Sequence, residues 1–227
     1  FLGAGARVLE PLTVGAAVYA ATGAGAEYEG LPEFDGLDMS LEVGVIEAAI
    51  PVAYRVSDEL SLGVALRGAF CFLSTDMPID IGGTGGPLRL EQSLSGFGAP
   101  GVLVGMSWHP TDTVAFGATY RSKMTIDLEG DGTATHSFLG ENPVEIESRF
   151  ATADAIRFGT AVSLLDQRLL VAFEVSHALL SDAYEVLPLS IDFTERPDTH
   201  LEQEVVLGWR DSQSASLGIE YDLSDTW

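Results

Sequence analysis

Four cationic side chains are the residues of this sequence whose types and surroundings could do chemistry. Arg67, Arg121 and Arg157 stand in stretches of alternating apolar and small residues, and Lys123 follows two positions after Arg121. A cation in a low-dielectric site binds a carboxylate strongly. We therefore predict that these four residues line a ligand site. The alternative, in which they pair with acids such as Glu174 and only hold the fold together, stays open.

Motifs for catalysis or metal binding do not emerge. The single cysteine, Cys71, excludes an intramolecular disulfide and a cysteine-based zinc site. No Gly-x-Ser-x-Gly elbow occurs, and the four histidines have no metal-ligand spacing. The acids of segment 127–131 could hold Ca²⁺, but their spacing does not match an EF-hand loop. We expect a protein that is not an enzyme and that uses no metal and no cofactor.

The overall charge narrows the class of partner. The chain has 227 residues with 11 basic and 34 acidic side chains, which gives a formal net charge of −23 at pH 7. Contacts with phosphate backbones need Lys and Arg, so we expect no binding of nucleic acid. Hydrophobic residues make up 46% of the chain, and this fraction argues against a disordered protein.

The stretches that must position the cations alternate with period two, which is typical of β-strands. Between Leu60 and Phe72 the even positions are mostly large and apolar, whereas the odd positions are small or polar and include Arg67. Arg121 and Arg157 also fall on the small face of their stretches. An Arg or Lys facing lipid costs about 2–4 kcal/mol near the bilayer midplane. The pattern therefore predicts a barrel whose large apolar residues face lipid and whose small residues face a lumen.

Similar short turns recur along the chain and link these stretches in pairs. The turns follow Tyr54, Trp108 and Tyr221, which are aromatic residues of the kind that gather at membrane interfaces. The longer connections are rich in Asp and Glu; they are residues 23–40, 76–93, 128–149 and 192–204. Short turns of outer-membrane barrels face the periplasm and long loops face outside, so we expect an acidic extracellular rim. Ordinary hairpins of a soluble barrel are the alternative.

The pattern predicts about nine strands in a single domain of the all-β class. Their approximate bounds are 1–8, 12–22, 41–55, 60–75, 94–108, 113–128, 150–164, 168–187 and 205–221. Bacterial single-chain barrels usually have an even number of strands, and an open sheet edge is untenable in lipid. We therefore expect residues 1–227 to be one partial, antiparallel transmembrane β-barrel of outer-membrane type, cut from a longer chain.

Several motifs on these strands resemble those of one known family. The most specific is the stretch Tyr120-Arg121-Ser122-Lys123, which leads to Asp127-Leu128-Glu129-Gly130-Asp131. Further similar segments follow in family order at 50–56, 96–112, 156–159 and 209–221. Together they resemble the FadL/TodX family of outer-membrane transporters for long-chain fatty acids and other hydrophobic compounds.

The resemblance implies a 14-stranded barrel with an N-terminal plug, of which the plug, the first strands and the last strands are missing here. It also implies that substrate leaves sideways at a kinked strand. We assign this strand to segment 41–55, where Ile46 and Glu47 disturb the alternation and Pro51 lacks a ladder donor. A plain edge-strand proline is the alternative interpretation of Pro51.

An apolar groove near the extracellular loops would receive the substrate first. Its candidate residues lie in or beside the longer connections, where simple loop packing is the alternative; they are Phe72, Leu94, Phe97 and Phe138.

The residues and the resemblance together predict passive transport of hydrophobic molecules, above all long-chain fatty acids, across the bacterial outer membrane. The expected partners are the substrate, membrane lipid and lipopolysaccharide, and we expect a monomer. The alternative function is that of a general porin or structural barrel that passes small polar solutes. An open polar pore would need more charged lumen residues than the Gly, Ala and Ser found here, so we rank it second.

Overall fold

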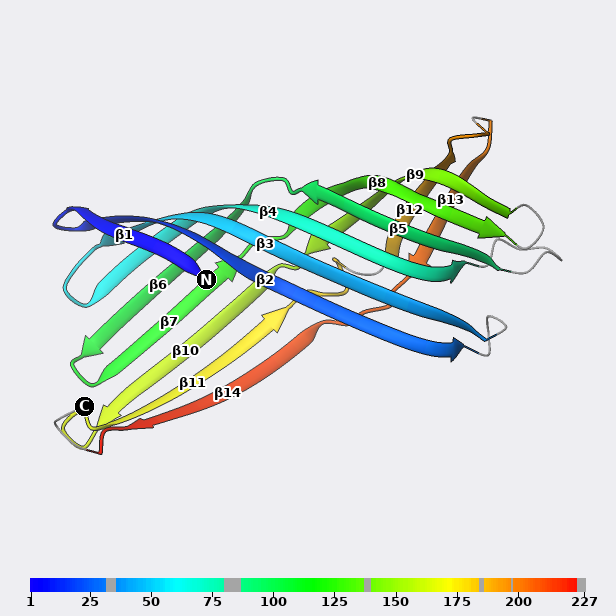
Figure 1. Cartoon of the computed structure of the whole chain (residues 1–227). Helices are drawn as coiled ribbons and strands as arrows, with labels where there is room; N and C mark the ends of the chain where they lie inside the picture. Colours follow the sequence, from blue (N-terminus) through cyan, green and yellow to red (C-terminus); the bar gives the residue numbers. More distant parts are fainter. Residues whose placement is uncertain (32–35, 80–86, 137–139, 184–185, 197, 224–227) are drawn as a thin grey trace.

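The fold is all-β, as the alternation predicts. The computed structural model describes residues 1–31, 36–79, 87–136, 140–183, 186–196 and 198–223. These residues form fourteen antiparallel strands that are hydrogen-bonded into one sheet (Figure 1). Within this part of the chain, no helix is long and apolar enough to cross a membrane.

All paired strands of the sheet are antiparallel. Their bounds are β1 (Leu2–Leu9), β2 (Leu12–Leu31), β3 (Leu37–Arg55), β4 (Leu60–Ile79), β5 (Leu88–Phe97), β6 (Gly101–Thr111), β7 (Val114–Arg121), β8 (Met124–His136), β9 (Gly140–Thr152), β10 (Ala155–Leu164), β11 (Leu169–Ala178), β12 (Val186–Phe193), β13 (His200–Val206) and β14 (Ser212–Tyr221).

The fourteen strands form nine rows in the sheet, which we call the wall. A row is the path that one of the nine predicted strands would take across the sheet, and it holds either one strand or two strands placed end to end. Strands β1 to β4 each fill a row. The other ten fill five rows in pairs, because β4 hydrogen-bonds β6 along Leu60–Arg67 and β5 along Phe70–Ile79. The prediction of about nine strands is therefore wrong for the last five, each of which is interrupted and counts as two strands.

The interruptions arise because each row takes one or more extra residues there. At the β5–β6, β7–β8 and β9–β10 breaks, inward positions are three residues apart instead of two, as with Arg121 and the buried Met124. Register between β6 and β7 continues unchanged between β5 and β8, so the breaks lie side by side. We call the aligned segments 98–100, 122–123 and 153–154 the bulge line. Such extra residues bend a strand and re-aim its side chains.

The bulge line divides the wall into two halves with different surfaces. The turn half contains β1, β6, β7, β10, β11 and β14 with the adjoining parts of β2 to β4, and it ends at the short turns. The far half contains β5, β8, β9, β12 and β13 with the other parts of β2 to β4. In Figure 1 the turn half lies at the left and the far half at the right.

The outer face of the turn half is an apolar band. Its exposed residues include Leu62, Val64, Leu66, Val104, Met106, Trp108, Phe116, Phe158, Phe173, Leu217, Ile219 and Tyr221. On β4 the outward apolar residues run from Leu62 to Phe72, about 33 Å along the strand at about 3.3 Å per residue. With the usual barrel tilt this corresponds to a height of about 25 Å, which matches the lipid-facing band of outer-membrane barrels. Trp108 and Phe116 stack at 5.5 Å near the turns, as expected of an interfacial girdle.

The far half corrects the prediction of long acidic loops. Most residues of 23–40, 76–93, 128–149 and 192–204 lie in extensions of the strands. Their outward positions carry exposed charges, such as Glu145 on β9, while their inward positions are apolar, such as Ile146. Acids on one face of a strand give the same composition as a polar loop, and the sequence interpretation mistook one for the other.

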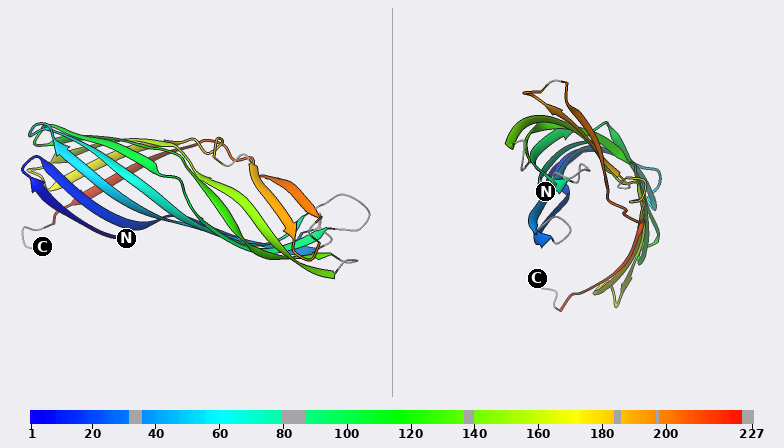
Figure 2. Two further views of the ribbon diagram at one scale, coloured as in Figure 1. Left: turned by 90° about the horizontal axis from the view of Figure 1, so that it is seen from above. Right: turned by 90° about the vertical axis from the view of Figure 1, so that its right-hand side faces the viewer.

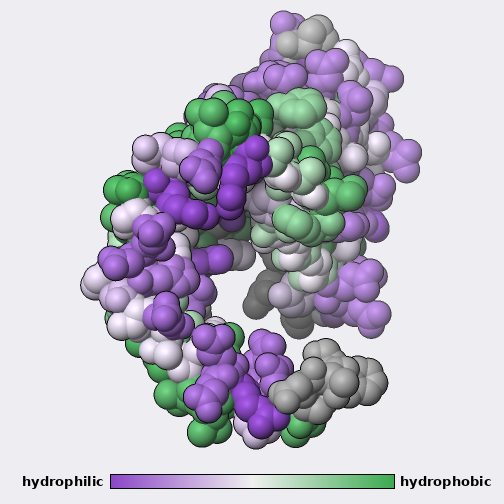
Figure 3. All heavy atoms as spheres, turned by 90° about the vertical axis from the view of Figure 1, so that its left-hand side faces the viewer, coloured by the Kyte–Doolittle hydropathy of each residue, from purple (hydrophilic) through white to green (hydrophobic). Residues whose placement is uncertain are grey.

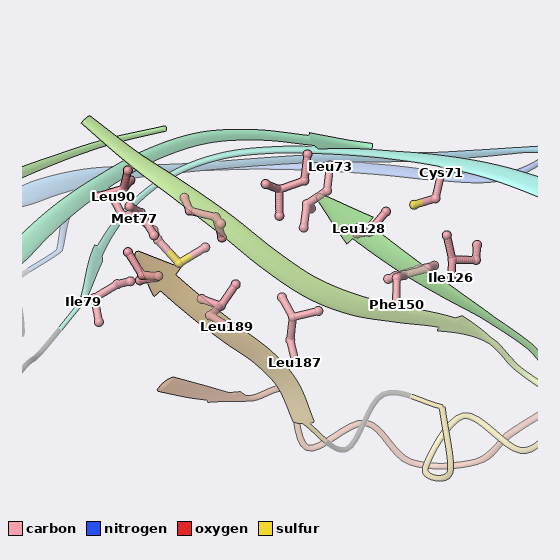
Figure 4. Packing of buried hydrophobic residues seen from close by; sticks show 14 of the residues in the cluster. Cys71, Leu73, Met77, Ile79, Leu90, Ile126, Leu128, Phe150, Leu187 and Leu189 are labelled. Atoms are coloured by element: carbon pink, nitrogen blue, oxygen red, sulfur yellow. The ribbon is translucent and has the colours of Figure 1, made fainter. Parts of the chain in front are cut away.

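Inward apolar residues of the far half pack into one buried cluster, the far-half core. It includes Val45, Leu73, Met77, Leu90, Leu94, Ile126, Leu128, Ile146, Leu189 and Ile191. Figure 4 labels members of this core from β4, β5, β8, β9 and β12, among them Leu73, Leu128 and Leu189. Figure 2 shows the whole wall as a curved, open sheet, and within the described residues β1 pairs only with β2 and β14 only with β11.

Candidate functional site

The concave side of the wall holds a buried ion pair at the level of the bulge line. Glu47 of β3 is 0% exposed and Arg67 of β4 is 1% exposed. The Arg67 guanidinium donates two hydrogen bonds to the carboxylate, from Nε to Oε2 and from Nη2 to Oε1, each at 3.0 Å. Its Nη1 donates to the carbonyl oxygens of Val102 at 3.4 Å and Ser122 at 3.2 Å. Arg67 thus ties its own row, β4, to the rows of β3, β6 and β7.

Two further side chains complete this site, which we call the Glu47 cluster: Tyr19, Glu47, Arg67 and Arg121. The Tyr19 hydroxyl donates to Glu47 Oε2 at 2.9 Å, and Arg121 Nη2 donates to Glu47 Oε1. Strand register explains the assembly, because Tyr19 lies directly opposite Glu47 in the β2–β3 pairing. Arg121 is the last residue of β7, where the strand ends at the bulge line.

The charges within the Glu47 cluster do not balance. Two guanidinium groups share the single carboxylate of Glu47, so the cluster carries a formal surplus of one positive charge. Arg157 is exposed on the same concave face, opposite Thr119 and one inward position nearer the turns than Arg121. The side chain of Arg121 is 25% exposed, whereas Arg67 is enclosed. Arg121 and Arg157 can therefore meet a ligand that enters the concave side, and Arg67 cannot.

Lys123 lies apart from this group of cations. It follows Arg121 within the bulge line, where its backbone N–H donates to Asp154 Oδ1 at 3.0 Å. Its Nζ donates to the carbonyl oxygen of Asp182 at 2.8 Å. These contacts connect the β7–β8 break to the later breaks. The structure thus brings Arg67 and Arg121 together, sets Arg157 nearby, and gives Lys123 a bridging position.

The four residues predicted for an outer groove do not share one surface. Leu94 is buried in the far-half core, while Phe97 is 81% exposed on the outer face. Phe72 also points outward, and its ring lies over Gly44, where an added Cβ would stand 2.3 Å from the ring. Phe138 lies outside the described residues. The separation of Leu94 from Phe97 follows from strand alternation, because the two residues are an odd number of positions apart.

The strand predicted to carry the irregularity is itself regular. Strand β3 pairs with β4 in one unbroken register from Ser40 to Arg55, with Ile46 outward and Glu47 inward. The irregularity lies instead on the neighbouring strand β2, where the register shifts between Ala20 and Thr22. The alternation at Ile46–Glu47 only looks broken in sequence, because a charged residue takes an inward position.

Pro51 does interrupt the ladder between β2 and β3. The pairing runs through Val14–Val52 and Ala17–Ala49 but skips the two residues between them on each strand, which include Pro51. Proline has no N–H to donate, which accounts for the gap. Nearer the far end, β2, β3 and β4 border a groove of about 890 Å³ on the outer face. Most of its lining residues are small, and the lining also includes Ile46, Phe72, Glu27 and Glu42.

Two residues of the Glu47 cluster were not predicted as site residues in this role. Tyr19 was not singled out, and Glu47 was assigned to a kink instead of to charge pairing. The sequence does contain a signal for Glu47. It stands at an odd position, like Val45, and its strand is expected to pair with the strand of Arg67. For Tyr19 no such signal exists without the register of β2 against β3.

Small side chains line the concave face of the turn half. One line of directly paired residues crosses the strands from Ser107 through Gly117 and Gly159 to Glu174 and Ser216. Figure 3 looks at the molecule from the turn end and shows the hollow that the wall encloses. Within the described residues, no group of three or more His, Cys, Asp or Glu side chains is arranged to hold a metal ion.

Comparison with protein families decides the relationship of the chain. The family model for outer membrane protein transport proteins (OMPP1/FadL/TodX) matches residues 3–227. The chain belongs to the FadL/TodX family. The resemblance noted in the motifs is thereby confirmed, and so is the outer-membrane type of the β-barrel fold.

Solved structures share this fold at low sequence identity. The toluene transporter TbuX of Ralstonia pickettii has a TM-score of 0.83 and 17% identity, over 95% of this chain and 63% of that chain. The toluene transporter TodX of Pseudomonas putida has a TM-score of 0.80 and 19% identity, over 99% and 64%. A FadL homologue of Pseudomonas aeruginosa has a TM-score of 0.75 and 14% identity, over 98% and 56%. The chain thus spans less than two thirds of the length of these relatives, and no curated protein matches it in sequence.

Proposed function

We propose that this protein carries hydrophobic molecules passively across the bacterial outer membrane, without covalent chemistry. Its family consists of outer-membrane transport proteins, and the similar structures include toluene transporters and a FadL homologue. The apolar band supports contact with membrane lipid and lipopolysaccharide. We further propose that residues 1–227 act as one barrel domain of a monomer, with the short turns in the periplasm and the far half outside.

Long-chain fatty acids are the substrates we propose, and the surplus of positive charge in the Glu47 cluster, with Arg157 beside it, carries this choice. Arg121 and Arg157 offer a guanidinium fork for a carboxylate head. An acyl tail would lie along the small, apolar wall of the turn half. Lys123 and Arg67 would act indirectly, the first by bridging the breaks and the second by holding Glu47.

A neutral aromatic hydrocarbon is the second candidate, favoured by the similar structures that are named as toluene and monoaromatic hydrocarbon channels. Such a cargo would have no use for Arg121 and Arg157. The far-half core argues against a general porin, because a polar solute would have to cross a packed apolar region.

Sideways exit between β2 and β3 is our proposal for the release step. Three observations support it: the shifted register at Ala20–Thr22, the missing ladder pairs beside Pro51, and the outer groove bordered by Ile46 and Phe72. A weakened ladder is the place where a wall of strands opens at the lowest cost. Glu47 would hold the inner side of this seam through Tyr19.

The test is binding of oleate to the complete protein in detergent, with sucrose as the control solute. We expect saturable oleate binding that toluene competes for weakly. Arg157→Ala should weaken oleate binding about tenfold, as expected for loss of a charge-assisted hydrogen bond, and Arg157→Lys should recover part of it. Arg55→Ala, at an exposed arginine near a short turn, is the matched control.

Two results would contradict the proposal. Equal oleate affinity in the wild type, Arg157→Ala and Arg121→Ala would remove the role of the cations and favour neutral cargo. Free passage of sucrose through reconstituted membranes, without oleate binding, would favour the porin.

A further inference from the structure

Two neutral polar side chains lie inside the far-half core. Thr75 of β4 is 3% exposed and Gln92 of β5 is 4% exposed, and the two residues are directly opposite each other in the β4–β5 register. Their side chains point to the same concave side as Leu73 and Leu94. Figure 4 labels Leu73 and Leu90, which are inward neighbours of Thr75 and Gln92 along their strands.

The polar atoms of this pair have no hydrogen-bond partner among the described residues. These atoms are Thr75 Oγ1, Gln92 Nε2 and Gln92 Oε1. Buried polar groups in folded proteins are nearly always hydrogen-bonded, and each exception needs an explanation. Leaving them unpaired in a low-dielectric core weakens the fold, whereas apolar side chains of similar shape would not.

Neighbouring strands cannot supply the missing partners. The residue opposite Thr75 on β3 is Leu41, and the residue opposite Gln92 on β8 is Gly132. No larger residue fits at Gly132, because an added Cβ would stand 2.5 Å from the Glu91 carbonyl oxygen. Along β4 and β5 the next inward residues are leucine or methionine. The residues directly opposite the pair and the next inward residues along both strands are therefore apolar or glycine.

We propose that Thr75 and Gln92 form a recognition site for the hydroxyl group of a neutral, otherwise apolar molecule. A hydroxyl both donates and accepts, and the amide and hydroxyl of the pair offer both complements. A carboxylate is a poor fit, because the nearest inward-facing cation on β4 is Arg67, eight residues or about 26 Å along the strand. This inference rests on the proposed transport of hydrophobic molecules and adds a class of cargo, phenols and alcohols, to it.

The closing experiment compares p-cresol with p-xylene, which differ by a hydroxyl in place of a methyl group. Binding of each radiolabelled compound to the complete protein in lipid nanodiscs is measured for the wild type and for Thr75→Val and Gln92→Leu. We expect the wild type to prefer p-cresol by about five- to tenfold over the ratio set by the lipid alone, the value of one buried hydrogen bond. Each variant should reduce this preference toward one.

Folding serves as the second readout. Because the substitutions remove unpaired polar atoms and keep the side-chain shape, Thr75→Val and Gln92→Leu should unfold at the same or a higher temperature than the wild type. The matched control is Ser74→Val with Ser93→Leu, a directly opposed pair on the outer face of the same strands. This control should keep the preference for p-cresol.

The outcomes separate the two proposals. Binding of both compounds without a preference in the wild type, or a preference that survives in both variants, overturns the recognition site alone. A lower unfolding temperature with unchanged preference also overturns it, since the pair would then be satisfied within the protein or by water. Binding of neither p-cresol nor p-xylene, together with no oleate binding, contradicts the transport function itself.

Discussion

Glu47 shows how one residue can hold several strands together. Its carboxylate is wholly buried and accepts hydrogen bonds from Tyr19, Arg67 and Arg121, which belong to three other strands. A buried ion pair adds little net stability compared with apolar packing, but removal of one partner leaves an uncompensated charge. The cluster is thus a point where small changes have large costs.

Glu47→Gln should therefore destabilise the barrel strongly. We expect a loss of about 3–5 kcal/mol in the free energy of unfolding, because two guanidinium groups lose their only carboxylate. Urea unfolding in lipid, followed by tryptophan fluorescence, measures the effect. Tyr19→Phe removes a single hydrogen bond and should cost only about 0.5–1.5 kcal/mol. Equal losses for the two variants would show that Glu47 is not the centre of the cluster.

His200 is a second residue with a testable state, and it lies on the far half beyond the apolar band. Its Nδ1 is 2.8 Å from Asp192 Oδ1 across the β12–β13 pair. The hydrogen bond to Asp192, helped by Glu202, raises the pKa of His200 above its ordinary value. A raised pKa means that the pair supports the hairpin at pH below about 6.5, and that this support is lost as the pH rises through the higher folded value.

An NMR titration of the His200 ring should give a pKa above about 6.5. Asp192→Asn should bring it down toward that value, whereas Asp198→Asn, at another exposed acid of the same hairpin, should change it little. A His200 pKa at or below the ordinary value in the wild type would contradict the paired state.

At the scale of strands, the change of phase at the bulge line is the main finding. Even-numbered residues face lipid on β6, as Val104 does, but face the core on β5, as Leu94 does. If a period-two pattern is extended across such a break, the residues beyond the break are assigned to the wrong face of the sheet. The prediction of one strand over 94–108 made this mistake, because Gly98, Ala99 and Pro100 interrupt the alternation without a long polar stretch.

Spin labels placed singly along residues 92–106 should report this shift of phase. On β6 we expect even positions to be accessible to oxygen dissolved in the lipid. On β5 we expect Ser95 and Phe97, which lie opposite Phe72 and Phe70 in the apolar band, to be accessible to oxygen, and Ser93 to be accessible to a water-soluble nickel complex. We expect the even positions of β5 to be protected from both reagents. An accessibility pattern that keeps one phase from 92 to 106 would refute the break.

Much of the fold was nonetheless present in the sequence. The inward placement of Arg67, Arg121 and Arg157 and the outward placement of the large apolar residues followed from parity within single strands. The partners of these residues did not follow, because register between strands depends on contacts that one strand does not encode. Tyr19 and the polar pair of Thr75 and Gln92 escaped prediction for this reason.

At the scale of the whole molecule, charge is the dominant property. The chain carries a net charge of −23, and the outer face of the far half holds carboxylates in directly opposed positions, such as Asp131, Glu145 and Asp192 on three neighbouring strands. Like charges in such pairs repel one another. An anionic substrate that approaches this end meets the same repulsion before it reaches any cation inside.

Ionic strength should therefore control the capture of fatty acids. When salt rises from about 10 mM to about 150 mM, the screening length falls from about 30 Å to about 8 Å. The association rate of octanoate with the complete protein should rise severalfold, while that of 1-octanol should stay constant. Stopped-flow displacement of a fluorescent fatty acid measures both rates. A fall in the octanoate rate with added salt would instead indicate attraction, and hence a cationic entrance.

The alternation of the wall also has an evolutionary consequence. Neighbouring positions such as Phe72 and Leu73 meet different surroundings, one outside and one in the core. During evolution, the inward residues at odd positions of β4 can therefore change one at a time. Such changes alter which substrates the interior accepts, while the residues that contact the membrane stay the same. The residues that determine substrate preference and the residues that contact the membrane thus alternate along the same strand and can change independently.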